Sequence, residues 1–198
     1  MITPIAAEPD WLSRLETPTA RDFAAYWLSR RGGLFMPRRR DIDPSEIRGL
    51  LPSICVLDVV SPEATVFRLA GTAHRETMGF EPTGRNIVDL VETHHRPVRA
   101  WRFWMSATQP CGQSLVLKMR FASGVEDEIE FLLLPVRVDD PRQRPVLIGV
   151  MASVQGRQWL NSTEGAERIA APLRFQFLDI GAGIPDCIVP EHLREEAA

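Results

Sequence analysis

The sequence predicts an α+β domain in which a five-stranded antiparallel sheet is covered on one face by short helices, with an extra N-terminal helix. Two strand-like runs, a stretch of short helices and three longer strand-like runs follow one another, and such strands can form one sheet. The 198 residues slightly exceed the common size of one domain, and 44% of them are hydrophobic. One core with terminal extensions is therefore expected.

The strands are predicted from the alternation of apolar and polar residues. The first two runs, Ile54–Val60 and Thr65–Ala70, are separated by a turn signal with a proline and together predict a hairpin. Apolar residues recur at every second position in Ser114–Ser123 and Glu126–Val138, which indicates half-buried strands. The last run, Pro145–Val154, is almost entirely apolar and is expected to be central or covered.

An N-terminal helix is expected from about Ala20 to Arg31. Thr19 can cap its start, and the two glycines after Arg31 end it. Phe23 and Trp27 lie one helical turn apart and put aromatic rings on one face. Because an uncovered apolar face is a liability, this helix is expected to pack against something.

Short helices are expected between the second and third strands. They are predicted at Thr72–Met78 and Asn86–Val91, and a longer helix runs from Val91 or Glu92 to Ala107. On the longer helix one apolar stripe is expected, with Arg96, Arg99 and Arg102 mostly elsewhere. The stripe consists of Val98, Trp101 and Met105, with Trp104 at its edge.

Four parts of the chain are predicted. They are a flexible N-terminal segment (1–18), an N-terminal helical extension (19–52), the domain that holds the sheet (53–156) and a partly disordered C-terminal extension (157–198). Alternating apolar residues in the C-terminal extension indicate an edge strand, which can pair with its own domain or with a second copy. These residues are Leu173, Phe175 and Phe177.

Charge and cysteine content exclude several classes of protein. The net charge of −3 offers no broad positive surface to a nucleic acid, and the run Arg38–Arg40 supplies few phosphate contacts. The three cysteines form no CxxC or Cys/His cluster, so no metal site is expected. No signal peptide is visible, and no apolar run approaches the roughly 20 residues of a membrane span. A cytoplasmic protein with neither nucleic acid nor membrane as partner is expected.

The order of elements, two strands, a helical stretch and three long strands, resembles that of a PAS domain. Several segments between residues 20 and 155 also resemble, in the right order, a bacterial family of small stand-alone PAS proteins. These segments are Leu34–Pro44 (LFMPRRRDIDP), Leu50–Pro52 (LLP), Phe67–Thr72 (FRLAGT), Gly79 and Thr83–Asn86 (TGRN), together with Trp27 on the N-terminal helix.

The resemblance implies a sensory or signalling module that acts through a small ligand or a protein partner, without a fused output domain and without catalysis. A homodimer formed through the N-terminal helix or the C-terminal segment is expected, because PAS proteins commonly dimerise through flanking helices. No cofactor is strongly implied, since PAS domains bind flavins, haem, small metabolites or nothing. A small-molecule enzyme on the same scaffold is the alternative, with His74, Arg75, Arg85 and Asp89 as its polar residues.

A ligand pocket is expected between the helices and the sheet. The stretch Gly84–Asp89 has no cysteine where flavin photoreceptors carry an Asn-Cys-Arg-Phe-type motif, which disfavours a covalent flavin photocycle. His94 and His95 are candidate haem ligands, because haem-binding PAS proteins use a histidine on the long helix. Core packing and a solvated helix start are the alternative roles of these candidates. The candidate pocket residues are Leu69, His74, Arg75, Met78, Arg85, Trp101, Met105, Met119 and Phe131.

Overall fold

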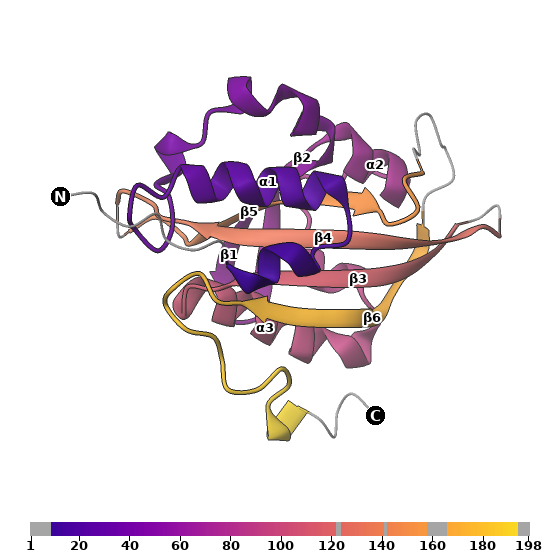
Figure 1. Cartoon of the computed structure of the whole chain (residues 1–198). Helices are drawn as coiled ribbons and strands as arrows, with labels where there is room; N and C mark the ends of the chain where they lie inside the picture. The colour runs from indigo at the N-terminus through magenta and orange to yellow at the C-terminus, as the bar shows by residue number, and fades with distance from the viewer. Residues whose placement is uncertain (1–8, 122–123, 141, 158–165, 194–198) are drawn as a thin grey trace.

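A six-stranded antiparallel sheet forms the centre of the computed structural model, which describes residues 9–121, 124–140, 142–157 and 166–193 (Figure 1). The strand order is β2-β1-β5-β4-β3-β6. The strands are β1 (Ile54–Ser61), β2 (Ala64–Ala70), β3 (Gly112–Phe121), β4 (Glu126–Val136), β5 (Val146–Ser153) and β6 (Ala166–Leu178). The five predicted strands are confirmed, and β6 adds a sixth at the β3 edge.

Helices lie on both sides of this sheet (Figure 1). The short helices cover one face as expected, and the extra N-terminal helix covers the other face. The α-helices are α1 (Pro18–Ser29), α2 (Thr72–Met78) and α3 (Arg96–Thr108). The 3-10 helices are η1 (Asp10–Arg14), η2 (Arg39–Asp41), η3 (Pro44–Ser53), η4 (Ile87–Leu90), η5 (Thr93–His95) and η6 (Glu191–Leu193).

Each face of the sheet packs into its own apolar cluster. Leu117 and Met119 of β3 pack with α2, α3 and η4, whereas Leu132 and Leu134 of β4 pack with α1. This separation follows from the pleat, which sends successive side chains to opposite faces. The central strands β4 and β5 bury both faces, which explains the almost continuous apolar run in β5.

The apolar face of helix α1 packs against the sheet of the same chain. Phe23 and Trp27 are fully buried against β4 and β5, and Trp27 Nε1 donates a hydrogen bond to the carbonyl of Pro135 (3.1 Å). The expected packing partner of the helix is therefore the sheet of the same chain. This face of α1 is not exposed to a second copy.

The segment that follows β6 contacts the residues on either side of α1. The segment 1–18 was expected to be flexible. Its residues 1–8 lie outside the described residues, while Trp11 and Leu15 pack into the α1 cluster. Trp11 Nε1 donates to the carbonyl of Asp179 (2.7 Å), and Arg31 donates to the carbonyl of Ile180 (3.1 Å). Of the predicted C-terminal extension, residues 158–165 and 194–198 are outside the described part, and β6 belongs to the sheet.

Helix α1 begins two residues earlier than the sequence predicted. Its N-cap is Thr17, whose Oγ1 accepts a hydrogen bond from the backbone N–H of Ala20 (3.1 Å), and Pro18 occupies the first turn. Thr19, the predicted cap, lies inside the helix. Local sequence offers two threonines that can cap, and the packed structure uses the first.

Replacing Thr17 with alanine is expected to lower the free energy of unfolding by about 1 kcal/mol, because the Ala20 N–H loses its acceptor. Thr19→Ala is the matched control and is expected to change stability by less than about 0.5 kcal/mol. Urea denaturation measures both values. A larger loss for Thr19→Ala than for Thr17→Ala would contradict the observed helix start.

Candidate ligand-binding site

A cavity of about 190 Å³ lies between α3 and the β3–β6 edge of the sheet. Its walls are largely apolar side chains from three elements. These are Val98 and Phe103 of α3, Leu115 of β3 and Phe175 of β6. Polar side chains also line it, namely His95, Arg99, Arg102 and Gln113. An apolar pocket with a few convergent polar groups is the usual form of a small-molecule site.

Arg99 is the most unusual of these polar residues because it is only 9% exposed. Its guanidinium carbon lies 5.5 Å from the ring centroid of Phe103, and its Nε is buried without a hydrogen-bond partner among the described residues. Burial, followed by repulsion from Arg102, lowers the pKa of Arg99 to about 10, so the side chain stays charged at neutral pH. A buried charge without a counter-ion is costly, and a bound anion would offset that cost.

Arg102 and Gln113 add further donors to the same cavity. The guanidinium carbon of Arg102 lies 3.8 Å from the ring centroid of Phe175, and its Nε donates to the carbonyl of Ile188 (3.3 Å). Burial lowers the pKa of Arg102 to about 10. The Nε2 amide nitrogen of Gln113 is buried and has no partner within the described part of the chain. No carboxylate is found among the described residues that line the cavity, so the site carries positive charge and unused donors.

The secondary structure explains how these side chains converge. Arg99 and Phe103 lie four residues apart on α3 and therefore share one face of the helix. Gln113 and Leu115 lie two residues apart on β3 and therefore share the sheet face that packs against α3. The cavity forms where these two faces meet.

None of the nine predicted pocket residues lines this cavity. Four of them are buried in the core between the sheet and the helices, three are exposed, and two lie half-buried on α3. The buried four are His74, Met78, Met119 and Phe131, the exposed three are Leu69, Arg75 and Arg85, and the half-buried two are Trp101 and Met105. A role of these residues in ligand binding stays a prediction.

Helix α3 buries Val98 of the predicted apolar stripe, but its other buried residues lie outside that stripe. Arg99, Phe103 and Ser106 are buried, whereas Trp101 and Met105 are only half-buried. Trp101 instead contacts the ring of Phe177 on β6, with centroids 5.9 Å apart. The expectation that Arg99 lies outside the buried face was wrong. Hydrophobic periodicity missed it because it treats an arginine as a surface residue.

His74 is a structural residue of the core. Its Nε2 lies 2.8 Å from the carbonyl of Ser53, and the rings of Phe67 and Phe131 lie about it with centroids 6.1 and 6.2 Å away. Burial lowers the pKa of His74 to about 4, against the opposing effect of the Ser53 hydrogen bond. The neutral ring therefore donates from Nε2–H and offers no positive charge to an anion at neutral pH.

The histidines predicted as haem ligands lie at the rim of the cavity. His94 is exposed, and His95 is half-buried and lines the opening. Desolvation lowers the pKa of His95, with repulsion from His94 as the second cause. A cavity of about 190 Å³ is below the roughly 300 Å³ at which pockets for drug-sized ligands begin, so it does not fit a haem or a flavin.

The buried cysteines are poor nucleophiles. Desolvation raises the pKa of Cys55 to about 12 and that of Cys111 to about 11. Both thiols stay protonated at neutral pH, and the reactive form of cysteine is the thiolate.

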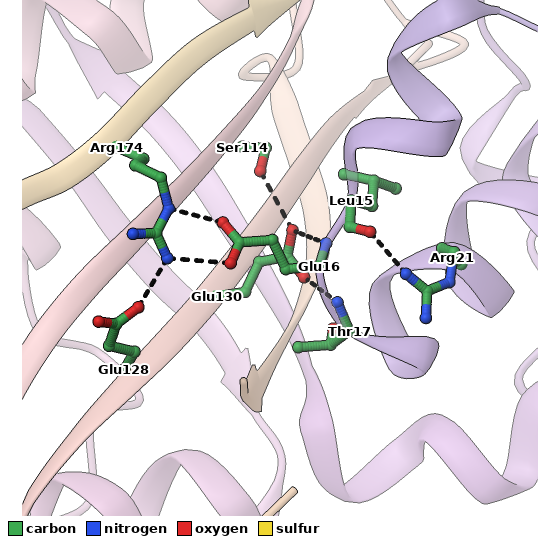
Figure 2. Close-up of polar contacts among 8 residues, drawn as sticks. All are labelled: Leu15, Glu16, Thr17, Arg21, Ser114, Glu128, Glu130 and Arg174. Carbon is green, nitrogen blue, oxygen red and sulfur yellow. Dashed lines mark hydrogen bonds and ion pairs between the residues drawn. The ribbon is translucent and has the colours of Figure 1, made fainter. Parts of the chain in front are cut away.

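A second polar cluster ties the start of α1 to the opposite face of the sheet (Figure 2). The buried carboxylate of Glu130 accepts hydrogen bonds from the backbone N–H groups of Glu16 (3.0 Å) and Thr17 (2.7 Å) and from the hydroxyl of Ser114 (3.4 Å). Negative charge at a helix N-terminus is favourable. Glu130 therefore anchors α1 to β4.

Arg174 of β6 extends this cluster across the sheet (Figure 2). It makes a bidentate pair with Glu16 (2.7 and 2.9 Å) and a further ion pair with Glu128 (2.6 Å). Hydrogen bonds first to Glu16 and then to Glu128 raise the pKa of Arg174 above its usual value. The cluster links β6 to the segment before α1.

A sheet of order β2-β1-β5-β4-β3 with its helices between β2 and β3 defines the class of PAS-type domains. A family model described as PAS domain matches residues 15–152, so the chain belongs to the PAS domain family. It is therefore a sensory and signalling module. Among the described residues, no helix combines the length and apolar character needed to cross a bilayer.

The chain is similar to three solved structures of light-oxygen-voltage (LOV) proteins. An RNA-binding LOV receptor is 20% identical over 59% of this chain and 34% of its own, with a TM-score of 0.43. A LOV protein of Rhodobacter sphaeroides is 15% identical over 57% of this chain and 68% of its own, with a TM-score of 0.40. A fungal LOV domain photoreceptor is 18% identical over 58% of this chain and 94% of its own, with a TM-score of 0.36. The chain thus spans about a third of the RNA-binding receptor, and no curated protein matches it.

Proposed function

We propose that this PAS module senses a small organic carboxylate in the cavity between α3, β3 and β6. The observation that carries the proposal is Arg99, which is buried, charged and without a partner among the described residues, in a largely apolar cavity. A guanidinium binds a carboxylate through two parallel hydrogen bonds, and such bonds are strengthened away from water. Gln113 supplies a further amide donor beside it.

The apolar walls and the volume describe the rest of the ligand. Phe103, Leu115 and Phe175 would contact an apolar body. At roughly 30 Å³ for each water-sized group, about 190 Å³ holds on the order of six heavy atoms. The proposed class is therefore a short aliphatic or small aromatic monocarboxylate.

The signal would leave the cavity through β6 and the C-terminal segment. Arg102 lines the cavity, covers the ring of Phe175 and holds the carbonyl of Ile188. A carboxylate that engages Arg102 would compete with the Ile188 hydrogen bond and change how residues 179–193 lie on the domain. A protein partner that reads this segment would sense the ligand.

Binding of short carboxylates is the experiment that tests this proposal. Butyrate, hexanoate and benzoate are titrated by calorimetry against their neutral primary amides. At least one acid is expected to bind and its amide to bind much more weakly, because only the acid neutralises Arg99. Equal binding of acid and amide, or no binding of any of these acids, would refute a carboxylate sensor of this size.

Replacing Arg99 with methionine is expected to weaken carboxylate binding by about 10- to 100-fold, the usual value of hydrogen bonds to a charged group. The variant should be at least as stable as the wild type without ligand, because it removes a buried charge that has no partner in the described part of the chain. Arg75→Met is the matched control, since Arg75 is exposed on α2 and was one of the two arginines that the sequence predicted in the pocket. An equal loss in both variants would argue against the cavity as the site.

Oligomeric state and catalysis remain separate proposals. We propose a homodimer through the C-terminal segment rather than through α1, because Leu173, Ile184 and Ile188 are exposed there. Native mass spectrometry measures the oligomeric state, and a monomer at micromolar concentration would contradict the proposed dimer.

The enzyme alternative is weaker, since its proposed residues do not converge: His74 is in the core, while Arg75, Arg85 and Asp89 are exposed. A bacterial source and a cytoplasmic location stay predictions.

A further inference from the structure

Three metal-ligating side chains gather at the turn that precedes α3. Each of Glu92, His94 and His95 offers a ligand atom within 4.8 Å of those of the other two. His94 Nε2 lies 3.6 Å from a carboxylate oxygen of Glu92, and the two imidazole rings have centroids 3.9 Å apart. Only His95 of this cluster lines the cavity, and the carboxylate proposal does not depend on the cluster.

The backbone of this turn brings Glu92 and His95 to the same side. Glu92 precedes the 3-10 helix η5, and its carbonyl accepts a hydrogen bond from the N–H of His95 (2.9 Å). With about three residues per turn, positions i and i+3 lie on the same side of a 3-10 helix. Arg96 secures the segment before the turn by donating to the carbonyls of Val91 (3.2 Å) and Asp89 (3.0 Å).

We propose that Glu92, His94 and His95 bind a divalent transition metal, with Zn²⁺ as the best match. Two imidazoles and one carboxylate are a His₂Glu donor set, which suits Zn²⁺ and leaves a fourth position open. Metal–ligand bonds of about 2.0–2.2 Å require ligand atoms roughly 3.3 Å apart in a tetrahedron. The 3.6 Å between Glu92 and His94 is close to that value, and both side chains are exposed enough, at 39% and 50%, to close the remaining distance.

The proposed metal site adjoins the cavity, because the two share one residue. His95 is at once a proposed ligand and a lining residue of the cavity. The open coordination position would therefore face the region where a small molecule enters. A metal here would order the turn at the start of α3, the helix that carries Arg99 and Arg102.

Zinc binding to the untagged full chain tests the site. Calorimetry with ZnCl₂, in the absence of any organic acid, is expected to show one saturable site, and Co²⁺ should give the visible absorption of tetrahedral coordination. His94→Gln is expected to weaken Zn²⁺ binding by more than the about 10- to 100-fold that loss of an outer-shell partner costs. His74→Gln removes a histidine that is buried in the core and is not part of the cluster, and should leave the affinity unchanged.

The same titration on Arg99→Met separates this site from the carboxylate site. Zinc binding should persist in that variant, because Arg99 is not among the proposed ligands. Absence of a one-to-one zinc complex in the wild type, or equal affinity in wild type and His94→Gln, would refute the metal site whatever the outcome for carboxylates.

Discussion

Replacing Glu130 with alanine is expected to lower the free energy of unfolding by about 3 kcal/mol, because two backbone donors lose their shared acceptor in a buried place. Glu130 is 1% exposed and accepts hydrogen bonds from the N–H groups of Glu16 and Thr17. Alanine supplies no acceptor, and water does not easily reach the Thr17 N–H, which is buried. Urea denaturation followed by tryptophan fluorescence measures the loss.

Glu128→Ala is the matched control for this experiment. Glu128 lies two residues from Glu130 on β4, and its side chain is 33% exposed. It pairs with Arg174, and in the Glu128→Ala variant Arg174 keeps its bidentate contact to Glu16. The control is expected to cost less than about 1 kcal/mol, as exposed ion pairs usually do. Equal losses for Glu130→Ala and Glu128→Ala would show that the buried carboxylate does not anchor α1.

The domain is expected to lose on the order of 3 kcal/mol of stability between pH 6.5 and pH 4 through His74 alone. In the folded state burial lowers the pKa of His74 to about 4, while the unfolded chain has a value near 6.5. The unfolded state therefore binds the proton more readily in this window. The contribution is fully present above about pH 6.5 and is lost as the pH falls towards the folded pKa.

Urea denaturation at a series of pH values, compared with a variant, isolates this contribution from the titration of carboxylates. His74→Gln should show a shallower loss of stability between pH 6.5 and 4, even where it is less stable at pH 7. His94→Gln removes an exposed histidine and should follow the wild-type pH dependence. If His74→Gln also kept the wild-type slope, the core histidine would not be responsible.

Strand β6 contacts both the proposed ligand cavity and the segment before α1. Arg174 and Phe175 are neighbours on this strand, so their side chains leave opposite faces of the sheet. Arg174 pairs with Glu16 before α1, and Phe175 forms a wall of the cavity. A ligand that displaces Phe175 is therefore expected to act on both the C-terminal segment and the α1 layer.

Local patterns determined most of the elements of this protein. The helix Thr72–Met78 was predicted with its observed bounds, and the predicted hairpin strands start or end within one residue of β1 and β2. Each of these elements depends on alternation, helical spacing or turn residues within about ten positions of sequence. Such signals act before any tertiary contact forms, so the sequence alone carries them.

The candidate site depends on contacts that no local pattern contains. Arg99 is buried because α3 meets β3 and β6, and residues 172–175 come to that place from more than 50 positions further along the chain. Of the predicted apolar stripe of α3 only Val98 is buried, because Trp101 packs on Phe177 of β6, while Arg99 and Phe103 are buried instead.

The sequence by itself therefore determined the family, the order of elements and the strands of the sheet. Only the tertiary structure decided which polar groups would lie unpaired in a cavity, which threonine caps α1 and where β6 pairs. The physical reason is that strand order and helix phase depend on burying apolar surface over long sequence separations, whereas the free energy of a single buried arginine depends on its surroundings in the folded state.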